Sequence, residues 1–188
     1  GKMIMTVEPK FIPNQAVSID LQEDLKINVR LVDCVGYVIE GASGYQDDSG
    51  IRLVKTPWYN ESIPFDQAAK IGTKKVIQDH STIGIVMTSD GSFLDIEERN
   101  YHQATQDIIE ELQNIGKPFI VIVNSKDPSS TTCQNVVESY RQKHDVPVVA
   151  MDVTNMLETQ VVHLLQEALN EFGVKEVKIE VPRYIAML

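Results

Sequence analysis

The sequence predicts an α/β fold in which a mostly parallel sheet lies between two layers of helices, with one antiparallel hairpin at its start. Two patterns predict this class. From residue 82 onward, short apolar runs alternate with segments of helical periodicity, as in chains that form parallel sheets. Upstream, two segments of alternating polar and apolar residues flank a short polar stretch, which is typical of a hairpin. The 188 residues are enough for one domain that buries a full core without disulfides.

The hairpin is expected to use residues 16–21 and 26–32, where apolar side chains recur at every second position. Its second arm continues directly into the segment Asp-Cys-Val-Gly at residues 33–36. A polar, glycine-containing stretch follows from residue 40 to residue 62. We expect this stretch to be a structureless connection that is either functional or mobile.

The remaining elements are expected in alternation. The predicted helices and strands are helix 64–79, strand 82–88, helix 100–115, strand 118–124, helix 133–144, strand 147–152 and helix 157–172. Pro64 suits the first residue of a helix, and Gly116 and Gly173 are expected to close helices in the left-handed conformation. The domain is therefore expected to span residues 1–173, and residues 174–188 form an exit segment that leads to a missing C-terminal region.

Charge and hydropathy exclude several classes of partner. The chain has 27 acidic and 17 basic residues, a net charge of −10, and its basic residues form no stripe. Nucleic acids and anionic membrane surfaces are therefore not expected partners, because they require clustered Lys and Arg. The apolar runs are far shorter than the roughly 20 residues that span a bilayer, so we expect a cytoplasmic location. A single phosphate could still bind at a helix N-terminus.

Asp33 and Gly36 form the strongest candidate motif, Asp-x-x-Gly at the end of an apolar strand. In nucleotide hydrolases an Asp at this place orients a water on Mg²⁺. A Gly three residues later lets a backbone N–H approach the γ-phosphate. The motif also occurs by chance, and its position after a strand is what favours the functional interpretation.

A second candidate site follows the strand predicted at 118–124. Asn124 and Asp127 have the spacing of the Asn-Lys-x-Asp motif with which P-loop GTPases bind their base, but Ser125 takes the second position and the lysine is displaced to Lys126. The alternative is that the Asn and the Asp only cap a loop. Ala150, after the last predicted strand, occupies the position of a backbone contact to the base, with the same alternative.

The phosphate-binding motif G-x-x-x-x-G-K-[ST] is absent from the 188 residues. Gly1-Lys2-Met3 does not supply it, because Met3 has no hydroxyl for Mg²⁺. We therefore expect a chain that is truncated at its N-terminus and that holds nucleotide poorly on its own.

The strand that feeds a phosphate loop lies centrally in a GTPase-like sheet, here between the strands ending at Asp33 and starting at Thr82. An empty slot is not expected, because unpaired buried backbone groups cost about 1–3 kcal/mol each. We expect the flanking strands to close up, together with a strand donated by a neighbouring chain, for which residues 174–181 are the most available. A retained N-terminal strand after a chain break is the alternative.

Beyond these motifs, the chain resembles the stage IV sporulation protein A family of endospore-forming Firmicutes over essentially its whole length. The stretches that carry the resemblance are residues 4–11, 31–37, 56–59 (Thr-Pro-Trp-Tyr), 116–119 and 151–153, and Gly84 with its flanking strand. The resemblance implies a P-loop, GTPase-like domain of a cytoskeletal ATPase, with Mg²⁺ as cofactor and ATP as substrate.

The same resemblance implies a place in the cell. The family polymerises on the forespore surface, in the mother-cell cytoplasm, as the basement layer for spore coat assembly. The implied partners are further copies of the protein, a small membrane-anchoring protein and other coat proteins. The chain would then be a middle fragment that lacks the Walker A loop and the C-terminal region.

Residue by residue, Thr6 matches the family's sensor threonine, which binds Mg²⁺ and the γ-phosphate, and Asp33 matches its Walker B aspartate. Val7 departs from the pattern, since a second threonine commonly stands there. Tyr37 stands where many GTPases have the glutamine that orients the attacking water. Either another group positions that water, or hydrolysis is slow and serves assembly.

Two other functions stay open at this point. The chain could act as a structural module that recruits coat proteins through its acidic surface, or as a regulatory GTPase, which Ser125 disfavours. The adjacent Trp58 and Tyr59 are either a loop anchor folded onto the core or part of an assembly contact. Cys34, between two valines, is expected to be a small buried side chain.

Overall fold

The computed structural model describes residues 10–23, 25–48 and 50–172. It has an α/β architecture with a parallel three-stranded sheet, as the sequence predicts. Thr6, Gly173 and residues 174–188 lie outside the described residues, so the expectations placed on them are not addressed by the structure.

The described helices are four α-helices and one 3-10 turn: α1 (Phe65–His80), η1 (Glu98–Tyr101), α2 (His102–Ile115), α3 (Thr131–His144) and α4 (Glu158–Asn170). The strands are β1 (Phe11–Gln22), β2 (Leu25–Val32), β3 (Gln46–Asp47), β4 (Gly50–Ile51), β5 (Leu53–Val54), β6 (Ile63–Pro64), β7 (Gly84–Ser89), β8 (Phe119–Asn124) and β9 (Val148–Met151). The elements expected between residues 64 and 172 all form, and their ends shift by at most two residues.

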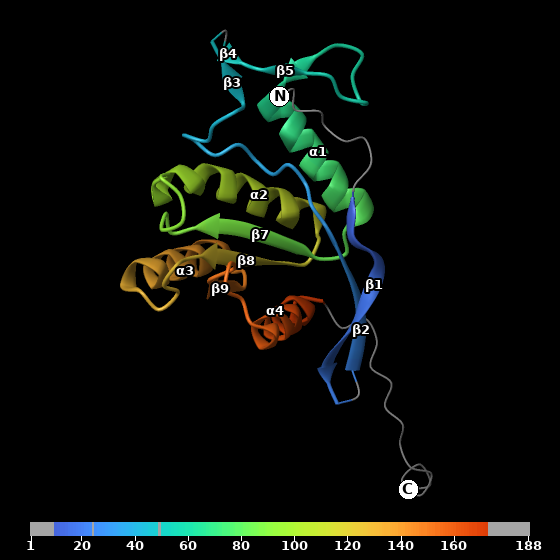
Figure 1. Cartoon of the computed structure of the whole chain (residues 1–188), viewed down its shortest axis with the longest axis vertical. Helices are drawn as coiled ribbons and strands as arrows, with labels where there is room; N and C mark the ends of the chain where they lie inside the picture. The colour runs from blue at the N-terminus through green and yellow to red at the C-terminus, as the bar shows by residue number, and fades with distance from the viewer. Residues whose placement is uncertain (1–9, 24, 49, 173–188) are drawn as a thin grey trace, which may run out of the picture.

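The central sheet has the order β7-β8-β9, and both pairings are parallel. Strand β8 lies in the middle and is buried from Phe119 to Val123. Helices α2 and α3 cover one face of the sheet and α4 covers the other (Figure 1). A strand with helices on both faces must be apolar at every position, which is why β8 has no polar residue before Asn124.

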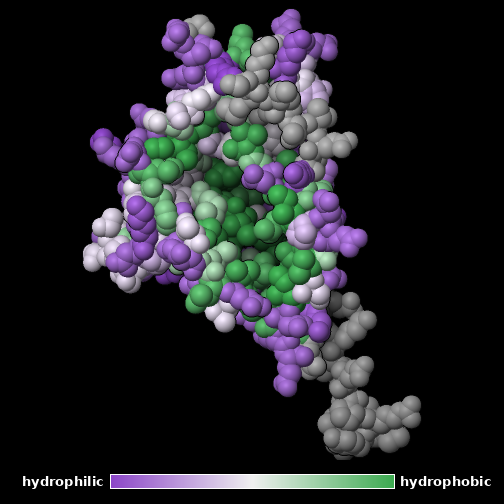
Figure 2. Space-filling model, in the orientation of Figure 1, coloured by the Kyte–Doolittle hydropathy of each residue, from purple (hydrophilic) through white to green (hydrophobic). Residues whose placement is uncertain are grey.

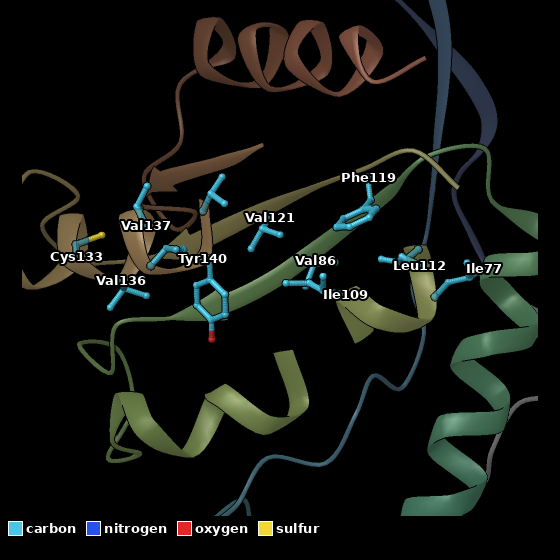
Figure 3. Close-up of a cluster of buried hydrophobic side chains, with 12 residues drawn as sticks. Ile77, Val86, Ile109, Leu112, Phe119, Val121, Cys133, Val136, Val137 and Tyr140 are labelled. Carbon is cyan, nitrogen blue, oxygen red and sulfur yellow. The ribbon is translucent and has the colours of Figure 1, made fainter. Parts of the chain in front are cut away.

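Side chains from successive positions of β8 enter different cores because a strand alternates its faces. Val121 and Val123 join Ile109 and Leu112 of α2 and Val137 of α3 in one cluster. Figure 3 shows the labelled members of this cluster between the sheet and the helices. The opposite face of the sheet packs on α4 in a second cluster, whose buried members are Ile120, Ile122, Met151, Leu164 and Ala168.

Local signals fix the helix ends. Gly116 ends α2 in the left-handed conformation with φ of 72°, as predicted, and its N–H donates to the carbonyls of Leu112 and Gln113. Helix α3 begins at Thr131, two residues before the predicted start, because the Ser130 hydroxyl accepts a hydrogen bond from the Cys133 N–H.

The predicted hairpin forms, and β1 extends it back to Phe11. The two ends of β1 contact helices α4 and α1. The Gln166 side chain of α4 donates to the Leu21 carbonyl at 2.7 Å. At the other end of β1, the Phe11 ring meets His80 of α1 edge-on at 6.4 Å between ring centroids.

The stretch 40–62 is not structureless, which corrects the prediction. It contains strands β3, β4 and β5, and β5 pairs with β6, which leads into α1. Val54 of β5 packs on Phe65, Ala68 and Ala69 of α1. Lys75 of α1 lies over the ring of Trp58 at 5.8 Å. This contact joins Trp58 to α1, whereas the adjacent Tyr59 is 51% exposed.

The expected closure of the sheet is wrong for the described residues. Strands β2 and β7 belong to different sheets, and no strand among residues 10–23, 25–48 and 50–172 lies between them. Leu31 of β2 is 58% exposed, and Ile85 and Met87 of β7 are 40% and 50% exposed. Figure 2 shows hydrophobic side chains lining a hollow on this side of the molecule. The prediction assumed that the edge groups would be buried, but in an open hollow water can bond them.

Among the described residues, no helix combines the length and the apolar character needed to cross a bilayer.

Candidate functional site

The loops that follow β7, β8 and β9 meet at the carboxyl end of the sheet, where open α/β sheets bind their ligands. Backbone hydrogen bonds join them. The Asp90 N–H donates to the Asn124 carbonyl at 3.4 Å, and the Ser125 N–H donates to the Met151 carbonyl at 3.0 Å. The structure thus brings the candidate residues Asn124, Asp127 and Ala150 to one end of the sheet.

Asn124 and Asp127 both make hydrogen bonds that organise these loops. The Oδ1 atom of Asn124 accepts from the Val153 N–H at 3.1 Å, which links the loops after β8 and β9. The Oδ1 atom of Asp127 accepts from the N–H of Ser129 at 3.1 Å and from its hydroxyl at 2.6 Å. Loop capping is therefore part of what these two residues do. Asp127 is exposed, so its second carboxylate oxygen can reach a ligand.

Lys126 contacts the loop after β7. Its N–H donates to the Ser92 hydroxyl at 2.9 Å, and its ammonium lies 5.8 Å from the centre of the Phe93 ring. This cation–π contact directs Lys126 toward that loop. The displaced lysine of the motif is thus engaged by a neighbouring loop at the carboxyl end of the sheet.

Ser125, which replaces the motif lysine, is fully buried and is the centre of a hydrogen-bonded group. Its hydroxyl donates to Oδ2 of Asp90 at 2.5 Å and accepts from the Asp127 N–H at 3.1 Å. Oδ1 of Asp90 accepts from the Ser92 N–H at 3.0 Å. Partial burial alone would raise the pKa of Asp90, but the hydrogen bonds from Ser125 and Ser92 outweigh it and lower this pKa below its usual value.

Asp33 and Gly36 lie on the chain that leaves β2. Asp33 is exposed, and no hydrogen bond or ion pair among the described residues uses its carboxylate. Gly36 has φ of +77° and open space where a Cβ would stand, so the backbone conformation is what favours glycine there. The Gly36 N–H donates to the Thr73 hydroxyl of α1 at 3.0 Å.

Cys34, inside this motif, and Tyr37, directly after it, are only partly buried. Cys34 is half-buried rather than fully buried as expected, and burial raises the pKa of its thiol. Burial, with smaller contributions from the charges of Glu111 and Asp107, raises the pKa of Tyr37 to about 12. The Tyr37 phenol is therefore protonated at neutral pH and can donate a hydrogen bond, but it cannot act as a base. Lys70 lies over its ring at 5.1 Å.

Among the described residues, no hydrogen bond or ion pair joins the Asp33–Gly36 segment to Asn124 or Asp127. The structure thus presents two separate groups of candidate residues. One is the loop cluster at the end of the sheet, and the other is the segment between β2 and α1.

Residues 1–173 match the family model of the stage IV sporulation protein A, ATPase domain. The chain belongs to this family. The stage IV sporulation protein A of Bacillus anthracis and that of Bacillus subtilis (strain 168) are each 50% identical to it over 188 residues, which is the whole chain. The protein of the same name from Clostridioides difficile (strain 630) is 43% identical over 185 residues, or 98% of the chain.

The chain spans 38% of the length of each of these relatives. No solved structure matches it significantly. The matched family model is that of an ATPase domain. The resemblance to a P-loop fold depends on the sheet and the motifs alone.

Asp90 and Ser92, which belong to the hydrogen-bonded group around Ser125, were not among the residues predicted from the sequence. Their signal is present in the sequence, since Ser-Asp-Gly-Ser at residues 89–92 begins at Ser89, the last residue of β7. Such a tetrapeptide also describes an ordinary turn. Only the register of β7 beside β8 shows that Asp90 lies next to Ser125.

Proposed function

We propose that the chain is the nucleotide-hydrolysing domain of a P-loop ATPase. The observation that carries the proposal is the placement of Asp33 and Gly36 directly after β2, with an exposed carboxylate and a left-handed glycine, in a chain of an ATPase-domain family. The carboxyl-end loops with Asn124, Asp127 and Ala150 support it as the place where the base binds. Thr6, outside the described residues, completes the proposed set.

The donor chemistry at Asp33 fits Mg²⁺. This ion prefers oxygen ligands and usually keeps several waters, with one or two carboxylates and the phosphates of the substrate. When bound, Mg²⁺ neutralises charge that develops on the phosphate oxygens. Asp33 would hold waters of the ion, Thr6 would supply a hydroxyl, and the Gly36 N–H would donate to the γ-phosphate.

We infer that the chain works as part of a longer protein, because it spans 38% of the length of its relatives. The phosphate-binding loop would come from that remaining part. A strand and a helix that carry this loop would cover the exposed side chains Leu31 of β2 and Ile85 and Met87 of β7. Burying such side chains stabilises a domain by about 1.5–3 kcal/mol each.

The proposed role is to couple ATP hydrolysis to polymerisation on the forespore surface, as the basement layer on which the spore coat assembles. The names of the relatives support sporulation as the setting. The proposed partners are other copies of the protein, a small membrane-anchoring protein and other coat proteins, in the mother-cell cytoplasm. Nucleic acid and direct membrane binding are not part of the proposal, in keeping with the net charge of −10.

A structural scaffold that recruits coat proteins is the competing function. Concentration-dependent assembly of the complete protein, followed by sedimentation with and without ATP, separates the two. Assembly that requires hydrolysable ATP supports the proposal, and equal assembly without nucleotide favours the scaffold.

The complete protein is expected to prefer ATP to GTP by at least about tenfold, which is the effect of roughly one charge-assisted hydrogen bond. Guanine presents two adjacent N–H donors, whereas Asp127 has one carboxylate oxygen already bonded to Ser129. Competition between the two nucleotides for a fluorescent ATP analogue measures the preference. A preference for GTP would instead support a regulatory GTPase.

A thiol introduced by Met87→Cys in the complete protein is expected to react at least about tenfold more slowly with a thiol reagent than one introduced by Leu94→Cys. The two native side chains have similar exposure in this chain, 50% and 62%, but only Met87 lies on the strand beside the hollow. Peptide mass spectrometry gives both labelling rates. Equal rates would show that the β7 surface is open and that the proposed covering strand and helix are absent.

A further inference from the structure

Asp90, Ser125 and Asp127 form a chain of hydrogen bonds that connects β7 to the loop after β8. Asp90 is the first residue after β7, and Ser125 is the first residue after β8. Ser125 is fully buried, while Asp127 at the other end of the chain is exposed. The bonds therefore lead from the edge of the core to a carboxylate at the surface.

The direction of these bonds is determined by Asp90. A serine hydroxyl has one proton to donate and two lone pairs that accept. Because the Asp90 carboxylate accepts that proton at 2.5 Å, the lone pairs of Ser125 remain available for the Asp127 N–H at 3.1 Å. The lowered pKa of Asp90 keeps this acceptor ionised at neutral pH.

The bond to Ser125 fixes the backbone of Asp127, and Ser129 then orients its exposed side chain. Oδ1 accepts both hydrogen bonds from Ser129, and no hydrogen bond among the described residues uses Oδ2. Oδ2, the one available acceptor, matches the N6 amine, which is the single exocyclic amine of adenine. It does not match the two N–H donors of guanine.

We propose that Asp90 is a positioning residue that acts through Ser125 to present Oδ2 of Asp127 to the exocyclic amine of adenine. This inference rests on the proposed ATPase function and names the specificity of its base-binding loop. Ser125, at the position of the motif lysine, then has a role of its own, because its buried hydroxyl joins Asp90 to the Asp127 N–H.

The experiment uses the complete protein, with ATP and with purine riboside triphosphate, an analogue that lacks the exocyclic amine. The wild-type protein is expected to have a KM about tenfold lower for ATP than for the analogue, the value of about one charge-assisted hydrogen bond. In Asp90→Asn the KM for ATP rises toward that for the analogue, while kcat stays within about twofold, because the phosphate-binding groups are unchanged.

Asp95→Asn is the matched control. It makes the same change of charge in the same loop, at an exposed residue for which no hydrogen bond is seen among the described residues, and it is expected to keep the wild-type ratio of the two KM values. Ser125→Ala removes the link itself and should match Asp90→Asn. The double variant should be no worse than either single one, because both changes break the same bond.

The outcomes separate this inference from the proposed function. If the wild-type protein hydrolyses ATP but has equal KM values for ATP and the analogue, the inference fails and the ATPase function stands. If the ratio is present in the wild type and persists in Asp90→Asn, the positioning role is wrong. If the wild-type protein hydrolyses neither nucleotide, the function fails and the inference fails with it. Because the wild-type comparison needs no variant, a misfolded variant does not remove the test.

Discussion

Replacing Asp33 with alanine in the complete protein is expected to abolish Mg²⁺-dependent ATP hydrolysis. The Asp33 carboxylate is exposed at the end of β2, and no partner among the described residues neutralises it, so it is available to the waters of a metal ion. Removing a group that stabilises charge in the transition state lowers kcat by about 10²–10³-fold, and loss of the metal ligand should reach at least the upper end.

Steady-state release of phosphate at saturating Mg²⁺ measures this effect. Asp95→Ala is the control, because it removes an exposed carboxylate from a loop that is not part of the proposed metal site. Binding of a fluorescent ATP analogue shows whether the nucleotide site itself survives. Normal turnover in Asp33→Ala would refute the assignment of Asp33 to the metal, whatever the variant does to assembly.

Replacing Leu112 with alanine is expected to destabilise the domain by about 2–5 kcal/mol, the range for a large aliphatic side chain removed from a packed core. Leu112 is 1% exposed and lies in the cluster between α2 and the sheet (Figure 3). The loss is a large fraction of the roughly 5–15 kcal/mol that holds a typical domain folded. Leu94→Ala, at a side chain that is 62% exposed, should change stability by less than about 0.5 kcal/mol.

Hydrogen exchange of peptides from β7 and β8 in the complete protein reports the opening free energy of this domain without requiring it to unfold alone. Gly84 offers a second test of the packing. A Cβ at this position would stand 3.1 Å from Cδ2 of Leu112 and 3.1 Å from Cβ of Phe119. Gly84→Ala should therefore cost less in the Leu112→Ala background than in the wild type. Strictly additive costs would contradict the contact between Gly84 and Leu112.

The parallel sheet could be predicted because its elements are long and their patterns are set by burial. Strand β8 is apolar from Phe119 to Val123, and α2 ends at a glycine in the left-handed conformation. The short strands between residues 46 and 54 could not be predicted, because a two-residue strand has no periodicity. Their pairing depends on turns and on the contact of Val54 with α1.

The candidate site was predictable only where one segment carries the whole signal. Asp33 with Gly36, and Asn124 with Asp127, are each recognised from spacing within one stretch of chain. Asp90 and Ser125 are 35 residues apart, and their hydrogen bond exists because β7 and β8 pair in a register that places Ser89 beside Asn124. The sequence alone does not give that register.

If the Gly36 N–H binds the γ-phosphate as proposed, its hydrogen bond to the Thr73 hydroxyl would make α1 a competitor of the substrate. A backbone amide has a single hydrogen, so an amide that turns to a γ-phosphate must leave Thr73. Thr73 is 1% exposed and its hydroxyl also interacts with the Cys34 thiol, so loss of the Gly36 bond would cost about 0.5–1.5 kcal/mol and would favour a shift of the helix when the phosphate arrives. The same helix carries Lys75, which contacts Trp58, and its Lys70 and Lys74 form ion pairs with Asp107 and Glu111 of α2. Binding or loss of the γ-phosphate would thus change the position of α1. This change would reach the loop that contains Trp58 through Lys75, and α2 through Lys70 and Lys74.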